Sequence, residues 1–358
     1  MDTARRTKLG LVLSGGGAKG AYEVGVLKAL ARCGCCPEVV AGASIGAVNG
    51  AVVASSPDLL TAATSLETLW NGVTTDSVLK LKPETAPAHY LALVGLNLLV
   101  RTYFATPMLT LSALISSIPQ IRDLFSDDDR RYISMLDHSP IEALVEKAVD
   151  LERLLSPGAL DFYVSVYPAS KAGGLVGLAK DVVRYAVSRD KSEFFRLKDV
   201  PRDTAAKLIL ASAAIPFAFK PMEYQGRRFY DGGMGDRVKA QGNTPVEPLV
   251  KAGCTHAIVV IIGNGVPWDR YEWPDLTVLE IRPSKVIDGM LDFDPARIRA
   301  LIALGEQDAT RSLARFAKAS AEVQGLMRAH QGLERAIADL ERRDPDYDDI
   351  VRAIRNGG

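Results

Sequence analysis

Residues 9–20 read LGLVLSGGGAKG, and residues 38–46 read EVVAGASIG. In each stretch a short apolar run ends at small residues, which predicts a buried strand that meets a tight turn. Residues 18–32 carry apolar side chains at helical spacing, and residues 45–55 are small and compatible with a helix. Strand, turn and helix, repeated in this order, are typical of the start of a parallel α/β sheet. We therefore predict an α/β fold with a central, mostly parallel sheet.

The rest of the sequence predicts one catalytic domain followed by a charged helical extension. Further apolar runs that suit strands occur between residues 160 and 281. Beyond Asp294 the chain becomes helical, with Arg, Glu and Asp at three- and four-residue spacing that suits solvated helix faces. We expect the catalytic domain to cover residues 1–320 and the extension to cover residues 321–358.

One strongly apolar segment, residues 88–118, interrupts the expected domain. Arg101 and Pro107 divide it, and neither part reaches the roughly 18 residues that a membrane-spanning helix needs. The segment either adds buried helices to an enlarged core or forms a surface that contacts lipid. Both alternatives stay open at this point.

The composition argues against a partner bound through bulk charge. Of the 358 residues, 43 are Lys or Arg and 43 are Asp or Glu, so no net charge attracts nucleic acid or an anionic membrane. The first residues lack the apolar stretch and cleavage site of a signal peptide. We therefore expect a cytoplasmic protein, although export by a route without such a signal stays open.

Three of the four cysteines lie together at Cys33, Cys35 and Cys36, and the fourth is Cys254. A zinc site would need a second pair of Cys or His at ligand spacing, and no such pair lies nearby in the sequence. We therefore expect no metal here and predict buried or half-buried thiols in a reducing compartment.

A serine lies at the turn between the second predicted strand and its helix. Gly42, Ser44 and Gly46 match the pattern G-x-S-x-G in the strand–turn–helix context that gives the pattern its meaning. Such a turn pushes the hydroxyl group out over the edge of the sheet. Glycine is needed two residues away on each side, because a side chain would collide with the neighbouring strand and helix. We predict that Ser44 is a nucleophile, favoured by the N-terminal amides of the helix that follows.

The glycine-rich turn after the first strand can be interpreted in two ways. Residues 15–20 fit the dinucleotide-binding pattern G-x-G-x-x-G, with Glu38 about 20 residues further on. Consecutive glycines also expose backbone N–H groups that can bind an oxyanion. Ser44 favours the second interpretation, because adjacent parallel strands bring both turns to one edge of the sheet. The oxyanion donors would be Gly15, Gly16, Gly17 and Ala18, and Lys19 and Gly20 complete the motif.

The serine needs a partner that accepts its proton. Among the histidines only His256, at the start of a predicted strand, is a plausible member of a triad. Asp231 is the stronger candidate, because it ends a strand and is followed by Gly232 and Gly233, which let the backbone turn sharply. A free aspartate has a pKa of about 3.9 and is a weak base, but burial in a cleft raises that pKa.

Taken together, these residues resemble the patatin-like phospholipase family. The matching motifs are residues 15–20, residues 42–46, the block ASAAIPFAFKP at residues 211–221, and Asp231 with its two glycines. Their order and approximate spacing agree over about residues 8–320. The resemblance implies a three-layer fold with a central, mostly parallel sheet flanked by helices. It also implies a Ser44–Asp231 dyad without histidine, oxyanion amides from residues 15–20, and no metal or organic cofactor.

Members of this family hydrolyse acyl esters of phospholipids, lysophospholipids or neutral lipids through an acyl-enzyme. The resemblance therefore predicts a serine-dependent lipid acyl hydrolase that binds a lipid or lysophospholipid and contacts a membrane surface transiently. Three alternatives stay open: an esterase of α/β-hydrolase type that uses His256, a dinucleotide-binding module, and a protein of this fold whose activity awaits a partner. The segment 234–242 departs from the family, because it is longer than members commonly have there and lies close to the predicted base.

Overall fold

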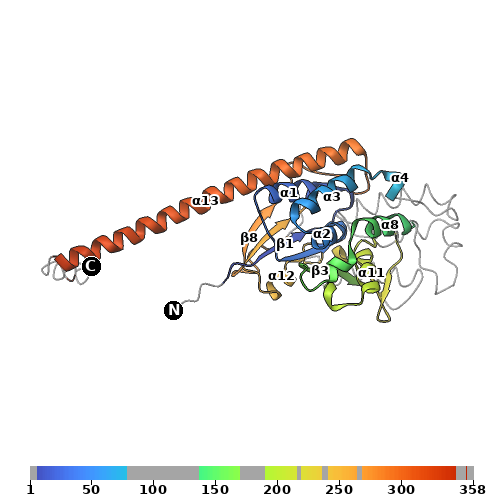
Figure 1. Ribbon diagram of the computed structural model, residues 1–358, viewed down its shortest axis with the longest axis horizontal. Coiled ribbons are helices and arrows are strands. Elements are labelled where there is room, and N and C mark those ends of the chain that lie inside the picture. The colour runs from blue at the N-terminus through green and yellow to red at the C-terminus, as the bar shows by residue number, and fades with distance from the viewer. Residues whose placement is uncertain are drawn as a thin grey trace, which may run out of the picture. The chain divides into compact units, whose positions relative to one another are not determined.

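A computed structural model gives the fold of the chain (Figure 1). The residues that it describes are 6–78, 137–169, 190–215, 219–235, 241–263, 268–343 and 352. The apolar segment 88–118 lies outside them, as does most of the segment 234–242. By their contacts the residues fall into two compact units, Met1–Thr310 and Arg311–Gly358.

The first unit is built on one eight-stranded sheet with the order β5-β6-β3-β2-β1-β7-β8, in which β4 also pairs with β3. Strands β1, β2, β3, β7 and β8 run parallel to one another, whereas β4, β5 and β6 join through antiparallel pairs. The prediction of an α/β fold with a mostly parallel sheet is therefore confirmed. The strands are β1 (Leu9–Leu13), β2 (Val39–Ala43), β3 (Asp161–Pro168), β4 (Glu193–Arg196), β5 (Met222–Tyr224), β6 (Arg227–Asp231), β7 (His256–Val260) and β8 (Thr277–Ile281).

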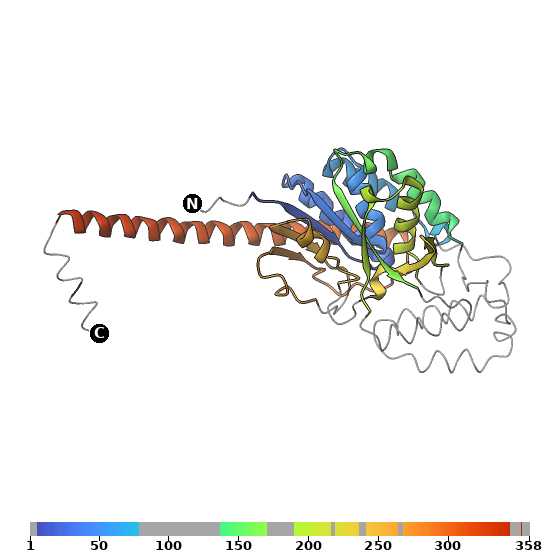
Figure 2. The ribbon, with the colours of Figure 1, turned by 90° about the horizontal axis from the view of Figure 1, so that it is seen from below.

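Helices cover both faces of the sheet (Figure 2). On one face α2 packs closely, since a Cβ atom at Gly50 would lie 2.7 Å from Phe162 and 3.4 Å from Val40. On the other face Val12 and Ala41 pack into a core cluster with Leu249 of α12. The helices are α1 (Ala21–Arg32), α2 (Ile45–Ser55), α3 (Leu59–Asn71), α4 (Thr75–Val78), α8 (Ser139–Ala148), α9 (Leu151–Leu155), α11 (Arg202–Ser212), α12 (Glu247–Lys251) and α13 (Pro295–Arg343).

The first turns of α13, up to residue 310, belong to the sheet-containing unit and press against α1. A Cβ atom at Gly25 would lie 1.9 Å from the carbonyl oxygen of Ile302, and one at Gly305 would lie 2.0 Å from the carbonyl oxygen of Tyr22. Glycine on both helices is what allows the two backbones to approach this closely. The Tyr22 hydroxyl group also hydrogen-bonds to the carboxylate of Asp308, at 3.3 Å.

The second unit continues α13 as a helix with mostly exposed side chains as far as Arg343. Its exposed apolar residues include Phe316, Leu326 and Leu333, spaced among charged side chains. The predicted boundary near residue 320 stays a prediction, since the division by contacts falls at residue 310. None of the described helices is both long enough and apolar enough to cross a membrane.

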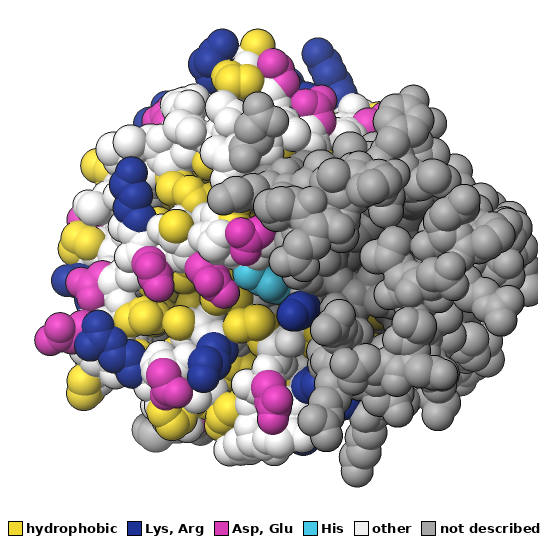
Figure 3. Space-filling model, turned by 90° about the vertical axis from the view of Figure 1, so that its right-hand side faces the viewer, with side chains coloured by type: hydrophobic (Ala, Val, Ile, Leu, Met, Phe, Trp, Pro, Cys, Tyr) yellow, Lys and Arg dark blue, Asp and Glu magenta, His cyan; other side chains and the backbone are white. Residues whose placement is uncertain are grey.

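Two surface features bear on the expectations from composition. Figure 3 shows basic, acidic and hydrophobic side chains interspersed over the described part of one face.

Cys35 is half-buried and Cys254 is buried, as predicted for the thiols. The prediction is wrong for Cys33 and Cys36, which are exposed because they lie in the turn that follows the end of α1.

Candidate active site

Ser44 occupies a strained turn between β2 and α2. Its backbone has φ 54° and ψ −126°, a left-handed conformation that non-glycine residues seldom adopt. The Ser44 amide donates a 2.9 Å hydrogen bond to the Ser212 hydroxyl group, which in turn donates a 2.6 Å bond to the carbonyl oxygen of Ser165. Ser212 of α11 thus ties the turn to the neighbouring strand β3 and holds the conformation in place.

The two glycines that flank Ser44 are required by close backbone contacts. A Cβ atom at Gly42 would lie 2.4 Å from the carbonyl oxygen of Gly46, at the start of α2. A Cβ atom at Gly46 would lie 2.2 Å from the carbonyl oxygen of Leu13, at the end of β1. The collisions with strand and helix that explain the G-x-S-x-G pattern are therefore present in the structure.

Asp231, at the end of β6, lies against the same turn. It is paired in register with Val166 of β3, while Ala43, just before Ser44, is paired with Ser165. The Ser44 side chain interacts with the Asp231 carboxyl group and lowers its pKa. The Gly233 amide donates a 2.8 Å hydrogen bond to the same group.

The Asp231 carboxyl group is buried, with 4% of the residue exposed. Burial raises its pKa to about 6 from the ordinary value of 3.8, although the Ser44 side chain and the hydrogen bond from the Gly233 amide oppose the rise. Gly232 allows the close fit behind it, since a Cβ atom there would lie 2.2 Å from the carbonyl oxygen of Ser165. At pH 7 the group is therefore largely ionised, yet more basic than an exposed aspartate.

The glycine loop after β1 lies beside Ser44, because a Cβ atom at Gly15 would lie 2.8 Å from the Ser44 Cβ atom. Two of its amides already have acceptors: Gly15 donates to the carbonyl oxygen of Asn243 at 3.3 Å, and Ala18 donates to that of Met290 at 2.7 Å. Within the described part of the chain, the amides of Gly16 and Gly17 donate to no protein group. Gly17 has φ 59°, which suits glycine.

Lys19 and Gly20, which complete the loop motif, are packed into the interior and are not exposed donors. Lys19 is 7% exposed, and burial lowers the pKa of its ammonium group, with the charge of Asp288 opposing the shift. Gly20 permits close packing, because a Cβ atom there would lie 2.6 Å from Ile45 and 3.1 Å from Trp70. These two residues shape the loop and the wall beside Ser44.

Asn243 contributes to the site, although its sequence context alone gave it no role. Its side-chain amide donates to the carbonyl oxygen of Gly15 at 3.4 Å. Its Oδ1 atom lies so close to Gly15 and Gly233 that a Cβ atom at either glycine would approach it within 2.4 Å and 2.7 Å. Asn243 therefore fixes the distance between the glycine loop and the turn that follows Asp231. The only sequence signal for Ser212 was the block at residues 211–221 in which it occurs, and Asn243 lies in none of the four motif blocks.

The competing site residues lie at the other edge of the sheet. His256 opens β7 and is paired with Leu9, the first residue of β1, whereas Ser44 follows the last residue of β2. Its Nδ1 atom is within 2.9 Å of the Thr255 hydroxyl group. Glu38 likewise precedes β2 and forms an ion pair with Arg6 at 2.9 Å. Neither side chain reaches the glycine loop, so a triad with His256 and a ribose contact from Glu38 are both excluded by the topology.

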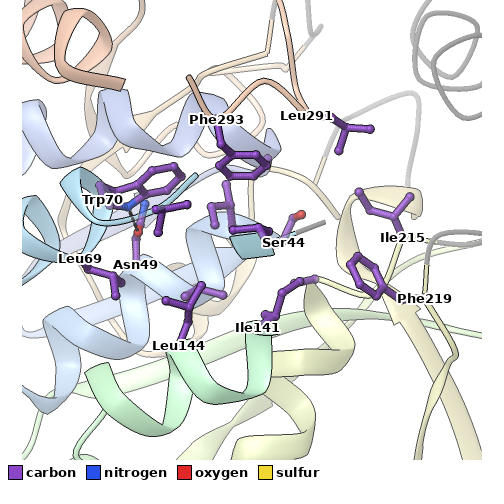
Figure 4. Close-up of a pocket in the computed structure, with 16 residues that line it drawn as sticks. Ser44, Asn49, Leu69, Trp70, Ile141, Leu144, Ile215, Phe219, Leu291 and Phe293 are labelled. Carbon is purple, nitrogen blue, oxygen red and sulfur yellow. Dashed lines mark hydrogen bonds between the residues drawn. The ribbon is translucent and has the colours of Figure 1, made fainter. Parts of the chain in front are cut away.

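A cavity opens beside Ser44 (Figure 4). Its empty volume is about 740 Å³, part of which is open to solvent. Apart from Ser44 and Asn49, the side chains that line it are all apolar. Figure 4 shows Trp70, Leu69 and Asn49 on one side of Ser44, and Ile215 and Phe219 on the other. Among the described residues, no group of three or more His, Cys, Asp or Glu side chains is placed to hold a metal ion.

A model of the patatin-like phospholipase family matches residues 11–250. The chain belongs to this family. The match spans the end of β1, the glycine loop, the Ser44 turn, Asp231 and Asn243, and the predicted family membership is confirmed.

Patatin-like relatives match over short segments. A patatin-like phospholipase domain-containing protein of Caenorhabditis elegans is 45% identical over 65 residues, which are 18% of this chain and 5% of the relative. Lysophospholipase nte1 of Aspergillus terreus is 50% identical over 52 residues, which are 14% of this chain and 3% of the relative. The solved structure of VipD from Legionella pneumophila is 16% identical, with a TM-score of 0.43, over 87% of this chain and 67% of that chain.

Proposed function

We propose that the chain is a serine-dependent lipid acyl hydrolase, with Ser44 as nucleophile and Asp231 as general base. The observation that carries the proposal is the position of Ser44 beside Asp231, at the same end of β3, together with the burial that raises the pKa of the Asp231 carboxyl group to about 6. A carboxylate in this state accepts a proton more readily than an exposed one and is still largely ionised near pH 7. Membership of a phospholipase family supports an acyl ester as the substrate.

The reaction would proceed through an acyl-enzyme. The Ser44 hydroxyl oxygen attacks the ester carbonyl carbon while its proton passes to Asp231. The tetrahedral intermediate collapses, the ester C–O bond breaks, and the departing alcohol takes the proton from Asp231. A water molecule then gives a proton to Asp231 and attacks the acyl carbon, after which Ser44 leaves with that proton and the fatty acid is released.

The charge on the tetrahedral intermediate would be stabilised by the amides of Gly16 and Gly17. These are the two amides of the Gly15–Ala18 stretch that donate to no protein group among the described residues. Oxyanion donors of this kind contribute roughly 3 kcal/mol each to the transition state. The amides of Gly15 and Ala18, already bonded to carbonyl oxygens, would hold the shape of the loop rather than contact the oxyanion.

The substrate would be a phospholipid or lysophospholipid presented at a membrane surface. The apolar cavity suits the acyl part of such a molecule, and relatives of this chain include a lysophospholipase. Peripheral contact with the membrane would then be transient. Segment 88–118, for which buried helices and a lipid-contacting surface are the two alternatives, lies outside the described residues.

The test is fluorophosphonate labelling of wild type, Ser44→Ala and Asp231→Asn, together with fatty-acid release from phospholipid and lysophospholipid vesicles. Labelling should be lost in Ser44→Ala, and release should be lost in both variants. Ser55→Ala is a matched control, because Ser55 of α2 is as buried as Ser44 and, among the described residues, its hydroxyl group bonds to Val52 of its own helix alone. Absence of labelling in folded wild type would contradict the proposal and favour a protein whose activity awaits a partner.

A further inference from the structure

The cavity beside Ser44 has the chemistry of a hydrocarbon site. Its walls expose almost no polar atoms and come from α2, α3, α4 and α8 and from the residues Ala213, Ile215, Phe219, Leu291 and Phe293. A polar head group placed there would lose its hydration without gaining hydrogen bonds, which is unfavourable. An acyl chain loses nothing by entering, because each buried methylene contributes about 0.8 kcal/mol.

Trp70 forms a wall of this cavity on one side of Ser44 (Figure 4). The residue is 3% exposed, and its ring stacks on that of Phe293 with centroids 6.2 Å apart and planes inclined by 18°. Behind it, the ring lies against Gly20, where a Cβ atom would be 3.1 Å away. Because Phe293 and Gly20 pack against it, the indole ring cannot rotate out of the cavity wall and so lengthen the cavity.

A buried polar network fixes the Trp70 ring through its indole N–H group. The indole N–H donates to the Asn49 Oδ1 atom at 3.1 Å. The Asn49 amide nitrogen donates to the carbonyl oxygen of Gly20 at 3.1 Å and to the Glu23 carboxyl group at 2.8 Å. Asn49 and Glu23 are both fully buried. Three buried hydrogen bonds therefore set the position of the ring and join it to the glycine loop.

We infer that the Trp70 side of the cavity holds the acyl chain of the substrate and that Trp70 sets its maximum length. Trp70 is then a specificity-determining residue, and Asn49 and Glu23 are positioning residues that act through it. This assignment rests on the proposed function at Ser44 and identifies the acyl chain as the part of the substrate whose length the cavity limits. Chains shorter than the cavity gain affinity with each methylene, and chains that reach the indole gain no more.

The chain-length profile of hydrolysis tests this assignment. In a series of lysophosphatidylcholines of increasing acyl length, kcat/KM of wild type should rise up to about four-fold per methylene and then stop rising. Trp70→Leu should increase the ratio of kcat/KM for long over short chains by about ten-fold or more. Val48→Phe, which narrows the cavity and leaves the Asn49 network intact, should decrease the same ratio. Phe219→Leu is the matched control, because it shortens an aromatic side chain on the other side of Ser44.

The possible results distinguish a failure of this inference from a failure of the proposed function. A shift in Phe219→Leu without one in Trp70→Leu would place the chain on the opposite side and overturn the inference. No shift in any variant, with hydrolysis still dependent on Ser44, would overturn it while leaving the proposed function standing. The inference can also be tested without catalysis, by adding a fatty acid brominated near its methyl end to Ser44→Ala. Tryptophan fluorescence should be quenched there and not in Ser44→Ala with Trp70→Phe; equal quenching in both proteins would refute the assignment.

Discussion

The substitution Asp231→Asn should make the protein more stable at neutral pH while abolishing its activity. In the folded protein, burial raises the pKa of Asp231 from 3.8 to about 6. Since one pKa unit corresponds to 1.36 kcal/mol, the ionised side chain destabilises the folded state by about 3 kcal/mol. This destabilisation is absent below pH 3.8, where Asp231 is neutral in both the folded and the unfolded state, and it is complete above about pH 6. Asparagine is neutral throughout and has nearly the same shape.

The assay is urea unfolding of wild type and Asp231→Asn at about pH 8 and about pH 4. The variant should exceed wild type by about 3 kcal/mol in free energy of unfolding at the higher pH, and this advantage should nearly vanish at the lower one. Asp58→Asn is the control of opposite sign, because a hydrogen bond from the Thr61 amide lowers the pKa of Asp58. Its contribution to stability is lost only as the pH falls below the ordinary value, so the control should gain nothing at pH 8. An Asp231→Asn advantage that is equal at both pH values would refute the reasoning.

Three further predictions concern the same site. The kcat/KM of wild type should rise with pH through about 6 as Asp231 ionises, and a flat profile across that range would contradict its role as base. Gly17→Ala should lower kcat by about 100-fold, because its Cβ atom would lie 2.2 Å from the Met290 carbonyl oxygen at a φ of 59°. Gly34→Ala, at φ 69° with no atom within 4 Å, should cost only about 1–2 kcal/mol of stability and leave kcat unchanged. Ser212→Ala should lower the free energy of unfolding by about 1–3 kcal/mol, because it leaves the buried Ser44 amide without its acceptor. It should also slow fluorophosphonate labelling relative to wild type.

Local pattern was sufficient to predict the elements that build the site. The apolar runs that end at the glycine loop and at Gly42 predicted β1 and β2 with their helices, because each signal lies within a dozen residues of the feature that it specifies. Asp231 was predicted for the same reason, since its two glycines follow it directly. These features depend on backbone geometry that short sequences dictate.

The features that local pattern could not supply depend on pairings between distant segments. Which amides of the glycine loop remain open is decided by Asn243 and Met290, more than 200 residues away in the chain. The exclusion of His256 follows from the register of β7 with β1. A strand start and a strand end look equally polar in a sequence, and only the sheet shows that they lie at opposite edges.

The contact between α1 and the first turns of α13 has a consequence for how this protein can be divided. The family match ends at residue 250, yet Gly25 and Gly305 interlock the two helices backbone to backbone. A fragment cut after residue 250 would leave Tyr22, wholly buried here, beside an empty groove along the helix that begins at the glycine loop. The compact unit therefore extends beyond the family match, and a shortened chain should keep the residues up to 310.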